Sequence, residues 1–145
     1  MGEPALTALF FADYVIVDEQ TKKKSVVGIF DQFFSQQFPI SFPPWWIFAG
    51  VTNLEGDHTF ALNLFSELDE GIVAISGGFK SEQLTGSIDI FPRIGQAIFP
   101  RPGDYRLTFH IDGVAIGQKI LRVRPLPAAG TPGIQMLPGI PPQIP

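Results

Sequence analysis

Alternation of apolar and polar residues with a period of two is the feature that most limits how this chain can fold. Between residues 105 and 112 every second side chain is apolar and its neighbours are polar or charged. This spacing is typical of a β-strand with one face in the core and one face in water. It predicts four core residues on this strand: Tyr105, Leu107, Phe109 and Ile111.

The residues that follow predict a hairpin. Asp112-Gly113 suits a two-residue type I′ turn, in which both central residues have positive φ. Residues 114–124 then return as the partner strand. Their apolar phase changes between Ile120 and Leu121, which indicates a β-bulge or a strand buried on both faces.

Similar short apolar runs, separated by Gly, Pro and Asp turns, recur along the chain, and no stretch has helical periodicity. The pattern predicts an all-β fold, an antiparallel two-sheet sandwich of the immunoglobulin-like kind with about seven or eight strands. A small β-barrel is the alternative closure. The predicted strands cover residues 5–17, 25–35, 45–53, 59–66, 71–79, 84–91, 105–112 and 114–124.

Composition divides the chain in two. Residues 1–124 carry every charged side chain and form the predicted domain, whereas residues 125–145 carry none and include seven Pro and three Gly. This segment predicts an extended arm outside the domain. In a polyproline II helix, with three residues per turn, Ile134, Leu137 and Ile140 share one edge. Together with Ile144 they are candidate interface residues.

Charge and composition exclude several functions. The formal net charge is −4 and there is no Cys, so nucleic-acid binding through a basic surface and a Cys-based zinc site are not expected. No apolar run reaches the roughly 18 residues of a membrane helix. We therefore expect a cytoplasmic protein without a membrane or nucleic-acid partner. The ligand class is left open, and no cofactor is expected.

Few residues suggest chemistry. The two histidines, His58 and His110, lie far apart in the sequence and belong to no catalytic motif. Asp13 and Asp31 interrupt apolar runs. If the first hairpin is centred on Lys22, they face each other across it and form a candidate metal or acid–base pair.

A structural role for the two aspartates is the alternative. An arginine such as Arg93, Arg101 or Arg106, or backbone N–H groups, then satisfies each carboxylate. A different register also keeps them apart. We expect no catalytic residue and no metal site, with Asp13 and Asp31 as the weak candidates for one.

An unusually apolar loop precedes a double tryptophan. Phe38 precedes Pro39, Phe42 precedes Pro43-Pro44, and Trp45-Trp46 follows. Loops seldom hold so much apolar surface without covering something, so these residues are candidates for an interface. Neighbouring strand residues point to opposite faces, so at most one indole can serve a ligand such as a sugar.

Two segments carry a resemblance to a known family. They are residues 10–33, with FFADYV at 10–15 and VGIFDQF at 27–33, and residues 102–123, with PGDY at 102–105 and Asp112-Gly113. They resemble the opening and the closing hairpin of a family of small uncharacterised bacterial β-sandwich domains. The resemblance covers residues 1–124, implies a fold without a known activity, and leaves the tail outside.

Low charge, apolar loops and an apolar tail together favour a non-catalytic interaction module that self-assembles, with its C-terminal arm packing on a neighbouring subunit. A carbohydrate- or peptide-binding module that uses one tryptophan is the second hypothesis. An enzyme that uses the pair Asp13 and Asp31 is the third.

Overall fold

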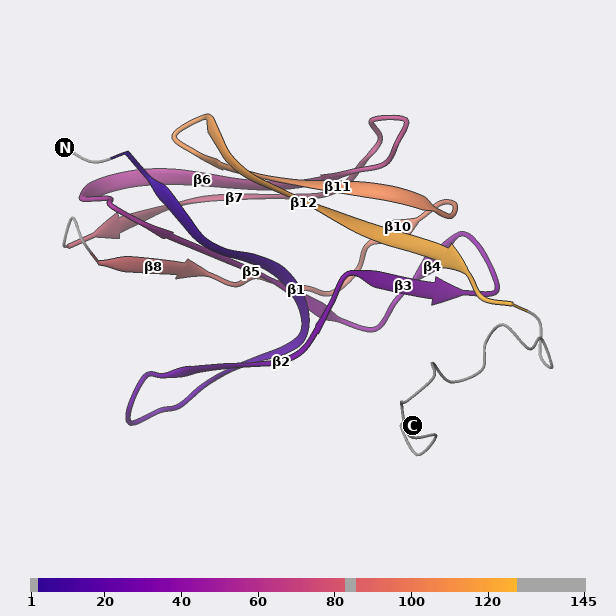
Figure 1. Cartoon of the computed structure of the whole chain (residues 1–145), viewed down its shortest axis with the longest axis horizontal. Helices are drawn as coiled ribbons and strands as arrows, with labels where there is room; N and C mark the ends of the chain where they lie inside the picture. The colour runs from indigo at the N-terminus through magenta and orange to yellow at the C-terminus, as the bar shows by residue number, and fades with distance from the viewer. Residues whose placement is uncertain (1–2, 83–85, 128–145) are drawn as a thin grey trace, which may run out of the picture.

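The computed structural model describes residues 3–82 and 86–127, and within these ranges it is built of strands and turns alone (Figure 1). The all-β prediction is confirmed, and none of the described residues forms a helix that could cross a membrane. The strands are β1 (Ala5–Val17), β2 (Lys24–Phe30), β3 (Gln32–Ser35), β4 (Ile40–Ser41), β5 (Trp45–Thr52), β6 (Gly56–Phe65), β7 (Gly71–Ser81), β8 (Ser87–Ile90), β9 (Arg93–Ile94), β10 (Ile98–Phe99), β11 (Gly103–Ile111) and β12 (Val114–Pro125).

Two curled sheets form the body. The β5 sheet has the order β2-β1-β5-β8, with β9 also paired to β5, and the β11 sheet has the order β3-β12-β11-β6-β7. The two sheets lie over one another (Figure 1). Apolar side chains from both meet in one core. The four predicted core residues of β11 are at most 2% exposed, which confirms them.

The β11–β12 hairpin forms as predicted, with one correction. Ile111 pairs with Val114, and the turn residues Asp112 and Gly113 have φ of 50° and 81°. The bulge, however, lies opposite Phe109 and His110, near Ile116, rather than at residue 120. A bulge there brings Gly117 so close to β1 that a Cβ atom would meet the Leu6 side chain at 2.9 Å.

Residues 25–35 do not form a single strand, contrary to the prediction. The chain leaves the β5 sheet after Phe30 and joins the β11 sheet as β3, which runs parallel to β12. The break lies at Asp31, whose carbonyl oxygen accepts a hydrogen bond from the Arg122 N–H at 2.9 Å. The β11 sheet is therefore mixed and not purely antiparallel, because the chain crosses between the layers here.

Aromatic side chains fill the core where the chain crosses. Phe33 stacks on Phe42 with ring centroids 4.1 Å apart, and Trp45 meets Phe33 edge to face at 5.7 Å. Phe99, on the short β10, contacts both Phe42 and Trp45. Such aromatic contacts stabilise this end of the core by more than the burial of their apolar area alone would give.

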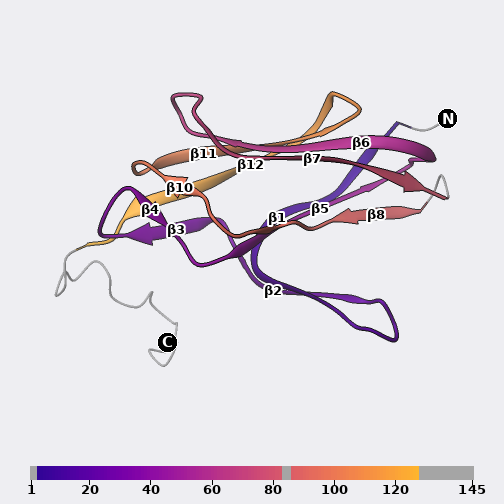
Figure 2. The ribbon, with the colours of Figure 1, turned by 180° about the vertical axis from the view of Figure 1, so that it is seen from behind.

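The β1–β2 hairpin makes a third layer on the outer side of the β5 sheet (Figure 1 and Figure 2). The N-terminal part of β1 pairs with β5, but its C-terminal part bends away and pairs with β2. On the side of the hairpin that faces the sheet, Val15 is buried. Lys24 forms an ion pair with Asp89 of β8 at 3.1 Å and lies over the Phe91 ring.

The bend in β1 depends on a glycine. Gly28 has a φ of 71°, and the Asp13 side chain occupies the place that a Cβ atom at position 28 would take. Burial changes phase here, because Phe11 and Ala12 are both buried while Asp13 and Tyr14 are both exposed. A regular strand would alternate, so the bend rotates the hairpin relative to the sheet.

We expect Gly28→Ala to lower the free energy of unfolding by about 1–3 kcal/mol, because alanine resists positive φ and its Cβ would collide with Asp13. Urea unfolding followed by tryptophan fluorescence measures the change. Gly95→Ala is the matched control, since Gly95 has open space around its Cβ position and no left-handed φ. Equal effects of the two substitutions would contradict this account of the bend.

Candidate functional site

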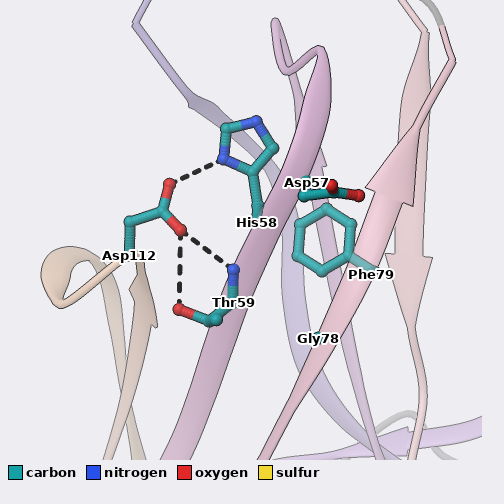
Figure 3. Close-up of a pocket in the computed structure, with 6 residues that line it drawn as sticks. All are labelled: Asp57, His58, Thr59, Gly78, Phe79 and Asp112. Atoms are coloured by element: carbon teal, nitrogen blue, oxygen red, sulfur yellow. Dashed lines mark hydrogen bonds and ion pairs between the residues drawn. The ribbon is translucent and has the colours of Figure 1, made fainter.

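An open depression of about 520 Å³ lies where the ends of β6 and β7 meet the β11–β12 turn (Figure 3). Asp57, His58 and Thr59 come from β6, Phe79 comes from β7, and Asp112 comes from the turn. The sequence had suggested no constellation around His58. Its partner Asp112 is 54 residues away and reaches it only because β6 pairs with β11.

Asp112 is fixed by the turn that it forms. Its positive φ points the carboxylate back at β6, where Oδ1 accepts a hydrogen bond from the Thr59 N–H at 2.9 Å. The Asp112 N–H in turn donates to the Thr59 carbonyl oxygen at 2.9 Å. The second carboxylate oxygen lies 2.6 Å from Nδ1 of His58.

Both ring nitrogens of His58 face atoms that can only accept. Nδ1 meets the Asp112 carboxylate, and Nε2 meets the carbonyl oxygen of Glu55 at 2.9 Å. Both contacts are hydrogen bonds only if both nitrogens donate, which requires the imidazolium form. The hydrogen bond that His58 donates to Asp112 raises the pKa of His58, and the one to the Glu55 carbonyl oxygen adds to this, while His58 lowers the pKa of Asp112.

The arrangement acts as a clamp between two turns. A doubly protonated His58 has no lone pair with which to accept a proton or bind a metal ion. Among the residues that the structure describes, no three His, Asp or Glu side chains gather to hold a metal. His58 therefore ties the turn before β6 to the β11–β12 turn, with the Phe79 ring 5.9 Å away.

The charged groups at the opposite end of the β11 sheet are also satisfied by one another. Arg101 binds Glu70 through two N–H groups at 2.7 and 3.1 Å. Together with the Ser66 hydroxyl, this lowers the pKa of Glu70 to about 2. Arg124 contacts Asp104 at 2.6 Å. The first pair joins the loops that precede β7 and β11, and the second joins β12 to β11.

Asp13 and Asp31 do not face each other, so the register assumed for the first hairpin is wrong. Asp18 begins its turn, because the Asp18 carboxylate accepts hydrogen bonds from the N–H groups of Gln20 and Thr21. Ala12 then pairs with Ile29, which sets Asp13 against Gly28. Asp31 instead lies 3.7 Å from the Arg122 guanidinium.

The structure places the predicted interface residues as follows. Trp45 is only 2% exposed, and Phe38 and Phe42 pack against the same core. Trp46 points to the outer side of the β5 sheet, beside Phe91. The four candidates of the tail lie outside the described residues: Ile134, Leu137, Ile140 and Ile144.

An apolar surface that the sequence analysis missed lies on the β1–β2 hairpin, on the side that faces away from the β5 sheet. Tyr14 is 62% exposed, Ile16 54% and Val27 45%. Tyr14 pairs directly with Val27, and Ile16 is two residues further along β1. These three residues are the hairpin's apolar side. Residues 14–17 are apolar without interruption, so the sequence does not say which side of the strand is buried.

Raising the pH through the pKa of His58 should destabilise the fold. The pKa of His58 is raised in the folded protein, so its contribution is complete below the unfolded value of 6.5 and is lost as the pH rises through the folded pKa. The loss is on the order of 0.5–1 kcal/mol, because the pair is partly exposed.

Urea midpoints measured between pH 6 and 9 check this expectation. The fall should disappear in His58→Gln and persist in the control His110→Gln. A fall of the same size in His58→Gln would show that another group causes it.

Comparisons with known proteins give a family but no activity. No curated protein matches the chain. Residues 7–124 match a family described as a family of unknown function (DUF6941). The match includes part or all of every strand and stops where the uncharged tail begins. This agrees with the resemblance to an uncharacterised domain family, with the tail outside it. On this match, the chain belongs to the family of unknown function DUF6941.

Proposed function

We propose that the protein is a non-catalytic interaction module that self-associates, with residues 125–145 of one copy packing on a neighbouring copy. The observation that carries the proposal is the hairpin's apolar side. Tyr14, Ile16 and Val27 form a contiguous uncharged surface, and each is at least 45% exposed. Contiguous exposed apolar surface on a folded domain is typical of a binding interface.

The way the hairpin is held supports the same function. Its inner side is occupied, because Val15 is buried and Lys24 is paired with Asp89. The hairpin therefore presents its outer side without first having to order itself, and a preorganised surface loses less entropy on binding. An apolar side chain that served only the fold would point toward the sheet.

The two alternatives have less support from the described residues. The sugar- or peptide-binding hypothesis keeps one tryptophan, because Trp45 lies in the core whereas Trp46 is half-buried beside Phe91. The enzyme hypothesis needed Asp13 and Asp31 to meet, and the register separates them. Neither alternative gains a new residue set from the His58 depression, where the polar groups bind one another.

We expect the full chain to be oligomeric at tens of micromolar in sedimentation velocity. The double variant Tyr14→Ser with Ile16→Ser should raise the dissociation constant at least about tenfold, since truncating central apolar anchors costs more than about 1.4 kcal/mol. The controls Leu68→Ser and Val114→Ser alter side chains that are 68% and 64% exposed but lie elsewhere, in the β6–β7 turn and at the start of β12.

Far-UV circular dichroism confirms that each variant keeps the fold. A monomeric full chain would refute the proposal. Equal losses of association in the double variant and in the controls would show that the hairpin is not the interface.

A further inference from the structure

The strand β7 forms a long sheet edge that is open to pairing. Its 11 residues pair with β6 on one side, and no strand of the described chain pairs with its other side. At about 3.4 Å per residue this edge measures roughly 37 Å. The backbone N–H and C=O groups along an open edge are a template for pairing with a further strand.

This edge lacks the features that usually protect an edge strand. Residues 71–79 contain no charged residue and no Pro, and Lys80 stands near the end of the strand. The other long edge strand, β2, is interrupted by Gly28 with its left-handed φ, and the edge strands β3 and β8 have four residues each. Short and bent edges resist pairing, so β7 is the edge best suited to accept a strand.

The large apolar side chains of β7 are only partly covered by their own molecule. Those that pack half-buried against the core are Ile72, Val73, Ile75 and Phe79. Beside them, a depression of about 270 Å³ lies between residues 72–75 and residues 93–96. A strand added to β7 would cover these side chains and place its own in the depression, so the edge suits an extended polypeptide.

The side chains of β7 complement those of a second β7 in size. In an antiparallel pair centred on Ile75, Val73 of one copy lies opposite Gly77 of the other. Ile72 likewise lies opposite Gly78. Each branched side chain therefore meets a residue that has none, and the two strands can approach closely.

The charges of two β7 strands agree with the same register. Lys80 is the charged residue of β7, and it comes opposite Glu70 of the other copy, which directly precedes the strand. Unlike charges therefore face each other at both ends and no like charges meet. At the centre Ala74 lies opposite Ser76, so no charge is buried there. A second copy of β7 is the occupant that this edge matches in both size and charge.

We propose that β7 of one copy pairs antiparallel with β7 of a second copy about a two-fold axis at Ile75, which joins the two β11 sheets into one. This inference goes beyond the proposed function, because the β7 edge is separate from the hairpin's apolar side and does not depend on it. A two-fold contact uses the same surface on both copies and is the commonest symmetry of protein pairs. Together with the hairpin, it gives each copy two contact surfaces.

Charge substitutions on the exposed side of β7 test this pairing, because Ala74 and Ser76 are both exposed. Ala74→Lys with Ser76→Lys places like charges opposite each other, whereas Ala74→Lys with Ser76→Glu places unlike charges there. Sedimentation velocity gives the dissociation constant of each full-length variant, alone and combined with Tyr14→Ser and Ile16→Ser to remove the hairpin contact. We expect the like-charge variant to raise the dissociation constant at least about tenfold over that of the unlike-charge variant in both backgrounds.

Cysteine cross-linking gives a second measurement, because the sequence contains no Cys. The single variants Ala74→Cys and Ser76→Cys are mixed and oxidised, and the linked peptides are identified by mass spectrometry. Each copy carries one thiol, so any disulfide joins two copies. We expect the 74–76 link to exceed the 74–74 and 76–76 links, because directly opposite residues lie closest.

The outcomes separate this inference from the proposed function. Equal dissociation constants for the like-charge and unlike-charge variants, both folded by far-UV circular dichroism, would overturn the β7 pairing and leave the hairpin contact standing. A dominant 74–74 link, or little product of any kind, would overturn the pairing about Ile75. A charge effect at β7 without any effect of the Tyr14 and Ile16 substitutions would support this inference and refute the hairpin contact alone.

Discussion

The close approach of Asp13 to Gly28 is the contact on which the arrangement of the molecule depends. It occurs where β1 turns out of the β5 sheet, and it requires a residue without a Cβ atom at a φ that other residues avoid. Because of this bend, one strand contributes to two layers. The N-terminal part of β1 closes the core, and the C-terminal part carries the hairpin.

The hairpin also covers an apolar row that two sheets alone would leave in water. Phe10 stacks on Phe48 with centroids 5.1 Å apart, and Phe91 also stacks on Phe48 at 6.0 Å. Phe48 is almost fully buried although its side chain lies on the outer side of the β5 sheet. The ion pair between Lys24 and Asp89 fastens the hairpin over this row, which leaves only its far side open to a partner.

The sequence alone predicted the elements whose contacts lie between residues close together in the chain. The alternation around Leu107 and the Asp112-Gly113 turn predicted β11, its core face and the start of β12. The clamp at His58 could not be predicted, since it joins residues that are distant in the chain. Trp45 was assigned to a possible interface because a strand pattern identifies two faces but not which one meets the other sheet.

The first hairpin shows a second limit of the sequence. Centring its turn on the lysines seemed natural, but the Asp18 carboxylate captures two backbone N–H groups and starts the turn earlier. Because of this earlier turn, Asp13 lies against Gly28 and not against Asp31 as predicted. The two aspartates therefore form no pair, and Asp13 lies instead at the bend in β1. A register error of this kind changes the functional hypothesis as well as the strand pairing.

Chemical labelling of the two tyrosines tests most directly whether the hairpin's apolar side is the interaction surface. Tyr14 is largely exposed and Tyr105 is buried, so Tyr105 serves as an internal control. Nitration by tetranitromethane should modify Tyr14 quickly in dilute protein and slowly at concentrations where the chain is oligomeric, while Tyr105 stays unmodified throughout. Equal reactivity of Tyr14 in the dissociated and the assembled protein would contradict the account.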